Sequence, residues 1–289
     1  MDYFTKKLQR FVSLVCFFSV LLLSACGGPR ITDGRIIPIS REEGSGARGS
    51  FVDLFGIVDE NKNDIVTINA EITNNTAVMI SSVKTNRRAI GYITIGVLND
   101  AVRAVKIDGV VPCVDNVKNG TYPFSRPFLI VTRSEVSALA NDFIEFILSA
   151  DGQNIVRQYD YVAVVLEAEA FVPSSIGGSI VVAGSSSVSP LMEKLREAYL
   201  RINPNANIEM QTNDSSTGVQ SVINGIADIG MCSRNLKQSE LDRGVFPKTI
   251  AKDGIAVIVN NINTLESLSK EDVKAIFTGQ ITLWKDILK

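Results

Sequence analysis

Short apolar runs alternate with amphipathic stretches along most of this chain, and that alternation constrains its fold more than any other feature. Strand-like runs are bounded by turn residues, and the stretches between them have helical spacing. The strand-like runs are 36–40, 89–98, 101–110, 126–133, 179–184, 207–212, 228–233 and 254–260, and the helical ones are 50–58, 77–84, 135–159, 191–202, 219–227 and 268–279. This order predicts an α/β fold with mostly parallel sheets flanked by helices. The Asp-Gly pair at 151–152 is expected to form a turn.

Composition narrows the class of function. The chain has 289 residues, a formal charge of −2 and 45% hydrophobic residues, enough for a sizeable core in one or two domains. The slight acidity argues against a nucleic-acid binder. The chain has no histidine, which excludes Ser-His-Asp and Cys-His catalytic arrangements and histidine metal sites. We therefore expect a binding protein rather than an enzyme, without catalytic residues, metal ligands or a cofactor.

The N-terminus is typical of a signal sequence. Basic residues precede an apolar run at 11–23, which is shorter than the ~20 residues of a membrane-spanning helix. Small residues then lead to Cys26 and resemble a bacterial lipobox. We predict a signal peptide at 1–25 and lipidation of Cys26, which would anchor the mature protein outside the cytoplasm. The alternative is an ordinary signal peptide with an incidental cysteine. Of the remaining cysteines, Cys113 and Cys232 either pair or stay free.

Three loops rich in serine and glycine stand between a strand-like run and a helix. They are 42–49 (EEGSGARG), 183–190 (AGSSSVSP) and 213–220 (NDSSTGVQ), and Arg41 precedes the first. Free N–H groups at helix N-termini attract anions, and an arginine can donate two hydrogen bonds to a tetrahedral oxyanion. Any one loop is more simply explained as a helix cap. Together they predict an anion site, although neither a Walker loop nor a dinucleotide-binding glycine pattern is present.

Eight segments of the mature chain carry a wider pattern: 38–51, 89–110, 122–132, 143–156, 181–195, 213–236, 252–260 and 268–287. Together they cover most of the mature chain, and they resemble the phosphate-binding protein of bacterial phosphate ABC transporters. The order differs, because the half that comes second in that family, about 30–162, comes first here and 179–289 comes last. This order indicates a circular permutation in which 163–178 joins the usual ends, its second half being a linker. The alternatives are a fusion of gene fragments or a domain-swapped pair.

The resemblance implies a two-domain periplasmic-binding-protein (type II) fold with the ligand cleft between the domains. One domain would be split, 26–126 plus 259–289, and the other continuous, 127–258, with crossings near Arg126–Phe128 and Val257–Asn260. A monomer is expected, with a domain-swapped dimer as the alternative. The implied phosphate-binding residues are Arg41, Ser45, Gly46, Ala47, Ser185, Ser186, Ser187, Ser215, Ser233 and Arg234.

The chain departs from the family pattern where ligand choice is concerned. Ala47 replaces a common threonine, Asp214 replaces a common glycine, and Ser233-Arg234 stands where some members have an aspartate that accepts the proton of phosphate. Phosphate over sulfate is thus an expectation from the resemblance alone. The carboxylates that remain as possible acceptors are Glu42, Glu43, Asp214 and Asp253.

The resulting hypothesis is an extracytoplasmic, lipid-anchored receptor that captures inorganic phosphate and delivers it to an ABC transporter permease. Two alternatives remain open: a receptor for another tetrahedral oxyanion such as sulfate, and a non-transporting relic or scaffold whose loops do not meet.

Overall fold

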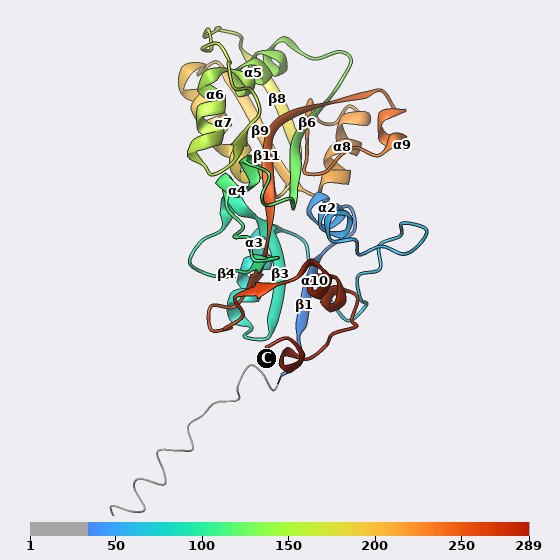
Figure 1. Ribbon diagram of the computed structural model, residues 1–289. Coiled ribbons are helices and arrows are strands. Elements are labelled where there is room, and N and C mark those ends of the chain that lie inside the picture. Colours follow the sequence, from blue (N-terminus) through green and yellow to red (C-terminus); the bar gives the residue numbers. More distant parts are fainter. Residues whose placement is uncertain (1–33, 289) are drawn as a thin grey trace, which may run out of the picture.

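The computed structural model describes residues 34–288, which form two lobes joined by strands (Figure 1). The strands are β1 (Ile37–Arg41), β2 (Glu71–Thr73), β3 (Ala89–Thr94), β4 (Arg103–Ala104), β5 (Lys106–Ile107), β6 (Ser125–Arg133), β7 (Val162–Ala163), β8 (Gly178–Ser185), β9 (Ala206–Asn213), β10 (Ile229–Cys232), β11 (Val245–Val259) and β12 (Ser267–Leu268). The helices are α2 (Gly46–Phe55), α3 (Thr76–Thr85), α4 (Val114–Lys118), α5 (Ala138–Leu148), α6 (Ala150–Gln158), α7 (Ser189–Ile202), α8 (Ser215–Ile223), α9 (Gln238–Leu241) and α10 (Lys270–Phe277), with 3-10 turns η2 (Ile95–Val97) and η3 (Trp284–Asp286). The predicted α/β class is confirmed.

Strand β11 links the two halves of the sheet, whose order is β2-β1-β3-β11-β6-β10-β8-β9. Its residues 245–254 pair with β6, and its residues 255–259 pair with β3, both antiparallel. Parallel pairing is found further out, where β1 joins β2 and β3, and β8 joins β9 and β10. The sheet is therefore parallel on either side of an antiparallel centre.

Strand β11 passes from one apolar core to another. One core, here called the first core, takes its buried side chains from 36–124 and 255–284, and the second core takes its own from 128–251. The crossings thus fall at 124–128 and 251–255. The second lies before the expected Val257–Asn260, because Val257 to Val259 pair with β3 and are buried in the first core. The domain boundaries at 126/127 and 258/259 remain a prediction.

Three helices begin directly after the carboxyl ends of parallel strands: α2 after β1, α7 after β8 and α8 after β9. Ser45 caps α2, since its hydroxyl accepts a hydrogen bond from the backbone of Arg48. Asp214 caps α8 in the same way through the backbone N–H of Thr217. The loops singled out in the sequence therefore do form helix N-termini.

The segment 135–159 forms two helices, and the expected turn at 151–152 is not where the chain bends. The break is at Ser149, which ends α5 and caps α6 by accepting from the N–H of Gly152. Gly152 lies inside α6, where an added Cβ would be 2.2 Å from the carbonyl oxygen of Phe146. Its glycine serves the close approach of two helices rather than a turn.

The segment 163–178 is attached to the second core. The side-chain oxygen of Gln153 accepts hydrogen bonds from the backbone of Val164 and Val165, and the Phe171 ring packs edge-on against Phe146. The sequence predicts a linker for its second half. The Phe171 contact shows that this part, too, packs against the protein.

Both cysteines among the described residues are free, with Cys113 half-buried and Cys232 fully buried. No helix between residues 34 and 288 is long and apolar enough to cross a membrane. The predicted signal peptide at 1–25 and the lipidation of Cys26 lie outside the described residues.

Gly218 sets how closely α8 lies on the strands beneath it. A Cβ at this position would be 2.6 Å from Gly184 Cα and 2.8 Å from the carbonyl oxygen of Ala183. We expect Gly218→Ala to lower the free energy of unfolding by about 1–3 kcal/mol through overpacking, measured by urea denaturation. The control is Ser221→Ala on α8, whose hydroxyl bonds only to the Thr217 carbonyl of the same helix, with an expected change within about 0.5 kcal/mol. Equal stability of the two variants would contradict this packing.

Candidate anion-binding site

Three buried serines at the carboxyl edge of the second lobe form a hydroxyl cluster, here called the serine cluster: Ser185, Ser215 and Ser233. The Ser233 hydroxyl accepts from Ser185 at 3.0 Å and lies 3.4 Å from the hydroxyl of Ser215. The backbone N–H of Ser233 donates to Ser215 Oγ at 3.1 Å. Residues from the end of β8, the start of α8 and the end of β10 therefore meet in one place.

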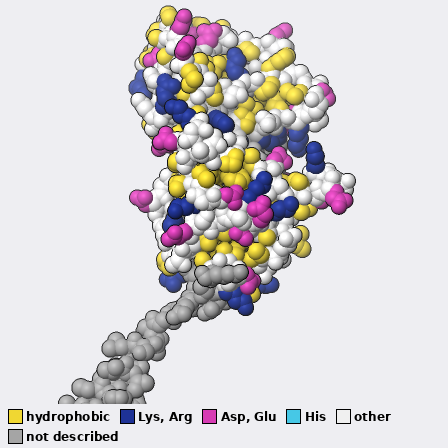
Figure 2. All heavy atoms as spheres, in the orientation of Figure 1, with side chains coloured by type: hydrophobic (Ala, Val, Ile, Leu, Met, Phe, Trp, Pro, Cys, Tyr) yellow, Lys and Arg dark blue, Asp and Glu magenta, His cyan; other side chains and the backbone are white. Residues whose placement is uncertain are grey.

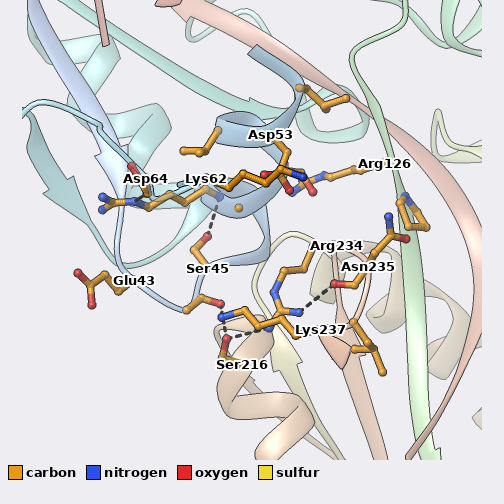
Figure 3. A pocket seen from close by; sticks show the side chains of 18 of the residues that line it. Glu43, Ser45, Asp53, Lys62, Asp64, Arg126, Ser216, Arg234, Asn235 and Lys237 are labelled. Atoms are coloured by element: carbon orange, nitrogen blue, oxygen red, sulfur yellow. Dashed lines mark hydrogen bonds and ion pairs between the residues drawn. The ribbon is translucent and has the colours of Figure 1, made fainter. Parts of the chain in front are cut away.

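The N-terminus of α2 reaches this cluster from the first lobe. A Cβ on Gly46 would lie 2.3 Å from Ser215 Oγ and 2.5 Å from Ser233 Oγ, so the position tolerates only glycine. The backbone N–H and hydroxyl of Ser216 both donate to the Gly44 carbonyl at 3.2 Å. Figure 3 shows Ser45 of α2 and Ser216 of α8 on facing sides of a cavity. The loops 42–49 and 213–220 are thus in contact between the lobes.

Arg41 connects the first lobe to the loop 183–190. Its side chain is buried at the end of β1, and its Nη2 donates to Ser186 Oγ at 3.1 Å. Glu42 offsets the charge, because both of its oxygens accept from the guanidinium, at 2.7 and 2.8 Å. On the same loop, the N–H of Ser187 donates to Ser185 Oγ at 3.3 Å. All three sequence-predicted loops therefore converge.

The convergence creates surroundings suited to a small oxyanion. The first turns of α2, α7 and α8 carry backbone N–H groups without helical partners and a partial positive charge. The α2 turn includes Gly46 and Ala47, whose backbone needs no side chain to donate. Serine hydroxyls rotate to donate or accept as a ligand requires. These groups, with Arg41, could hold a tetrahedral anion from two sides.

Two cavities flank the convergence. One of about 720 Å³ is lined by Ser45, Arg126 and Ser216 among others, and one of about 810 Å³ by Glu42, Ser186 and others. Figure 2 shows basic and acidic side chains intermixed over the face in view, with apolar areas between them. This face carries no single-sign patch, so selectivity for an anion would rest on the buried groups.

The Arg234 guanidinium bonds to Glu240 and Ser216 and not to the serine cluster, although the resemblance implies that it binds phosphate. Its two terminal nitrogens pair with Glu240 at 2.7 and 2.8 Å, and Nη2 also donates to Ser216 Oγ at 2.9 Å. The guanidinium therefore lines the first cavity and holds α8 and α9 together. Its role as a ligand stays a prediction that this geometry does not favour.

The four candidate proton acceptors differ in their surroundings. Glu42 is bound to Arg41, and Asp214 accepts from both the N–H and the hydroxyl of Thr217. Asp253 is buried and accepts from Arg126 and Thr94. Burial raises the pKa of Asp253, while the Arg126 guanidinium acts against that rise. Glu43 is exposed at the rim of the first cavity.

Arg126 is predicted from the sequence only as a crossing between the domains and not as a residue of the site. Its Nε pairs with Asp253 at 3.1 Å, and its Nη1 lies 3.3 Å from Ser233 Oγ. Ser50, also not predicted, donates to the Ser233 carbonyl at 3.1 Å. The available signal was an arginine at the head of an otherwise apolar strand, a position where burial demands a partner.

Known proteins match the chain along nearly its full length. The family model described as a PBP superfamily domain matches residues 29–151 and 172–289. Phosphate-binding protein PstS 2 of Streptococcus agalactiae is 43% identical over 293 residues, covering 98% of this chain and all of that protein. The crystal structure of a phosphate-binding protein of a phosphate ABC transporter from Streptococcus pneumoniae is 42% identical with a TM-score of 0.71, covering 88% of this chain and all of that one.

The match to another relative covers a smaller part of the chain. Phosphate-binding protein PstS of Bacillus subtilis is 33% identical over 112 residues, which is 38% of this chain and 37% of that protein. The full-length matches decide the assignment: the chain belongs to the PBP superfamily, in the family of PstS phosphate-binding proteins.

Proposed function

We propose that this protein is an extracytoplasmic receptor that captures inorganic phosphate between two domains and delivers it to an ABC transporter permease. The observation that carries the proposal is the convergence of three helix N-termini, buried serine hydroxyls and Arg41 from both lobes. The names and the full-length similarity of the streptococcal relatives support phosphate as the ligand. The protein acts by binding and release, without catalysis.

In this proposal, phosphate lies among Arg41, the first turn of α2 and the serine loops of the second lobe. Arg41 supplies charge, Ser45 fixes the α2 turn, and the backbone of Gly46 and Ala47 supplies N–H donors. The hydroxyls of Ser185, Ser186, Ser187, Ser215 and Ser233 complete the shell from the other side. Micromolar affinity needs about 8 kcal/mol, and each charge-assisted hydrogen bond contributes about 1.5–3 kcal/mol. Several such donors suffice.

The chain order is part of the proposal. We infer a split domain and a continuous domain in an order permuted relative to other members. They are predicted at 26–126 plus 259–289 and at 127–258, and we place the second boundary before Ile255, because residues 255–258 pack in the first core. The streptococcal relatives match almost end to end, whereas the Bacillus subtilis relative matches about a third of the chain. A permutation accounts for that difference, because a collinear alignment then covers only one half.

Location follows from the N-terminal residues. A signal peptide at 1–25 and a lipidated Cys26 would place the receptor outside the cytoplasm and tether it to the membrane beside its permease.

Isothermal titration calorimetry tests which anion the protein binds. The chain from Gly27 onward keeps every residue of both cores, and we expect it to bind one phosphate per monomer with micromolar or lower Kd. Its mass in solution should be that of a monomer. Sulfate binding as tightly as phosphate would support the alternative of a general oxyanion receptor. A folded protein that binds neither would reject the receptor hypothesis.

Two arginine variants test the place of the site. We expect Arg41→Met to weaken phosphate binding by at least about 10-fold, because it removes a charged donor from the convergence. Arg234→Met removes an equal charge that is tied to Glu240, and we expect its Kd to stay within about 2-fold of wild type. Titration of both variants, with circular dichroism to check folding, compares them. A larger loss for Arg234→Met would reverse the assignment.

A further inference from the structure

Arg126 and Asp253 form a buried ion pair between the two lobes. The residues face each other across β6 and β11, where the chain passes from one core to the other. Their side chains are 1% and 0% exposed, and Arg126 Nε lies 3.1 Å from Asp253 Oδ2. Thr94, at the end of β3, donates to the second carboxylate oxygen. Three strands from both lobes thus support one guanidinium.

Only some of the hydrogen-bond donors of the Arg126 guanidinium have partners. Nε donates to Asp253 and Nη1 contacts Ser233, but Nη2 is buried without a hydrogen-bond partner among residues 34–288. An unpaired buried N–H is costly, and on a cation more so. Because Nη1 already touches the serine cluster, Nη2 lies beside the place proposed for the anion, and Figure 3 shows Arg126 at the adjoining cavity. Arg126 therefore keeps a charged N–H donor without a partner next to the proposed anion site.

The charges of Arg41 and Arg126 also favour an anion at this place. The positive charge of Arg41 acts on Arg126 through space, and each guanidinium is offset by a single carboxylate, Glu42 or Asp253. Two buried cations near each other repel, and a dianion between them would turn that repulsion into attraction. Neither pairing leaves the arginine saturated, since each guanidinium has five N–H donors.

We propose that Arg126 is a second arginine ligand of the bound phosphate, that its Nη2 donates to a phosphate oxygen, and that Asp253 and Thr94 hold it in position. This inference rests on the proposed function of the site. It adds to the predicted set a residue that comes from the crossing strands and not from a helix N-terminus. The anion would then be fixed both to the walls of the cleft and to the strands that connect the lobes.

The test is titration of the chain from Gly27 onward with inorganic phosphate. Arg126→Lys keeps a positive charge opposite Asp253 but lacks the forked second donor, and we expect it to weaken phosphate binding about 10- to 100-fold. Arg41→Lys is the matched control at the site already proposed. If Arg126→Lys binds phosphate within about 2-fold of wild type while Arg41→Lys loses affinity, the inference is overturned and the receptor function stays intact.

A second variant separates ligand contact from folding. Arg126→Met combined with Asp253→Asn removes both charges, so no buried charge is left unpaired. We expect this variant to fold and to lose most of the rise in melting temperature that phosphate causes in wild type. A purely structural pair would change the melting temperature without phosphate but not that rise, and an unchanged rise would overturn the inference. Wild-type protein that does not respond to phosphate at all would instead reject the receptor function, and this inference with it.

Discussion

The pairing of one strand, β11, with strands of both lobes is the constraint on which the rest of the structure depends. One strand satisfies its backbone groups against β6 in the second lobe and against β3 in the first. Because strand register is fixed by these bonds, the carboxyl ends of β1 and β8 are held opposite each other. The helix N-termini that follow those strands can therefore meet. A site made of fragments from distant parts of the sequence depends on this shared ladder.

Burial determines what kind of ligand the place where these helix N-termini meet can bind. The serine cluster and Arg41 are buried, so their polar atoms must find partners within the protein or in a ligand. Serines partner one another readily, because a hydroxyl both donates and accepts. Arginines do so less readily, because all their N–H groups donate. Glu42 and Asp253 reduce this excess of donors without removing it. An excess of buried donors is the property expected of an anion receptor.

The sequence predicted the local structure well wherever a segment carried its own signal. The alternation of apolar runs and amphipathic stretches located most strands and helices, and the serine-glycine loops indicated helix N-termini. It missed features that depend on segments distant in sequence. The length of β11 follows from pairing with two strands that are distant in the sequence. The break at Ser149 has a local cause, because its hydroxyl accepts from the N–H of Gly152 and so caps a second helix. Arg126 and Arg234 look alike in the sequence, yet Glu240 pairs with one and Asp253 with the other. Only the tertiary structure separates them.

The ion pair of Arg126 and Asp253 also shows that the two crossings are bonded to each other. They lie side by side in one antiparallel ladder, in which Asp253 faces Arg126 and Gly254 faces Ser125. Two separate linkers would move independently, whereas two hydrogen-bonded strands move together, and paired strands already twist about their common axis. Relative rotation of the lobes would therefore follow the ribbon axis and keep its hydrogen bonds. The two paired strands therefore act as one hinge, and the resistance of this hinge to twisting would set how far and how often the lobes separate.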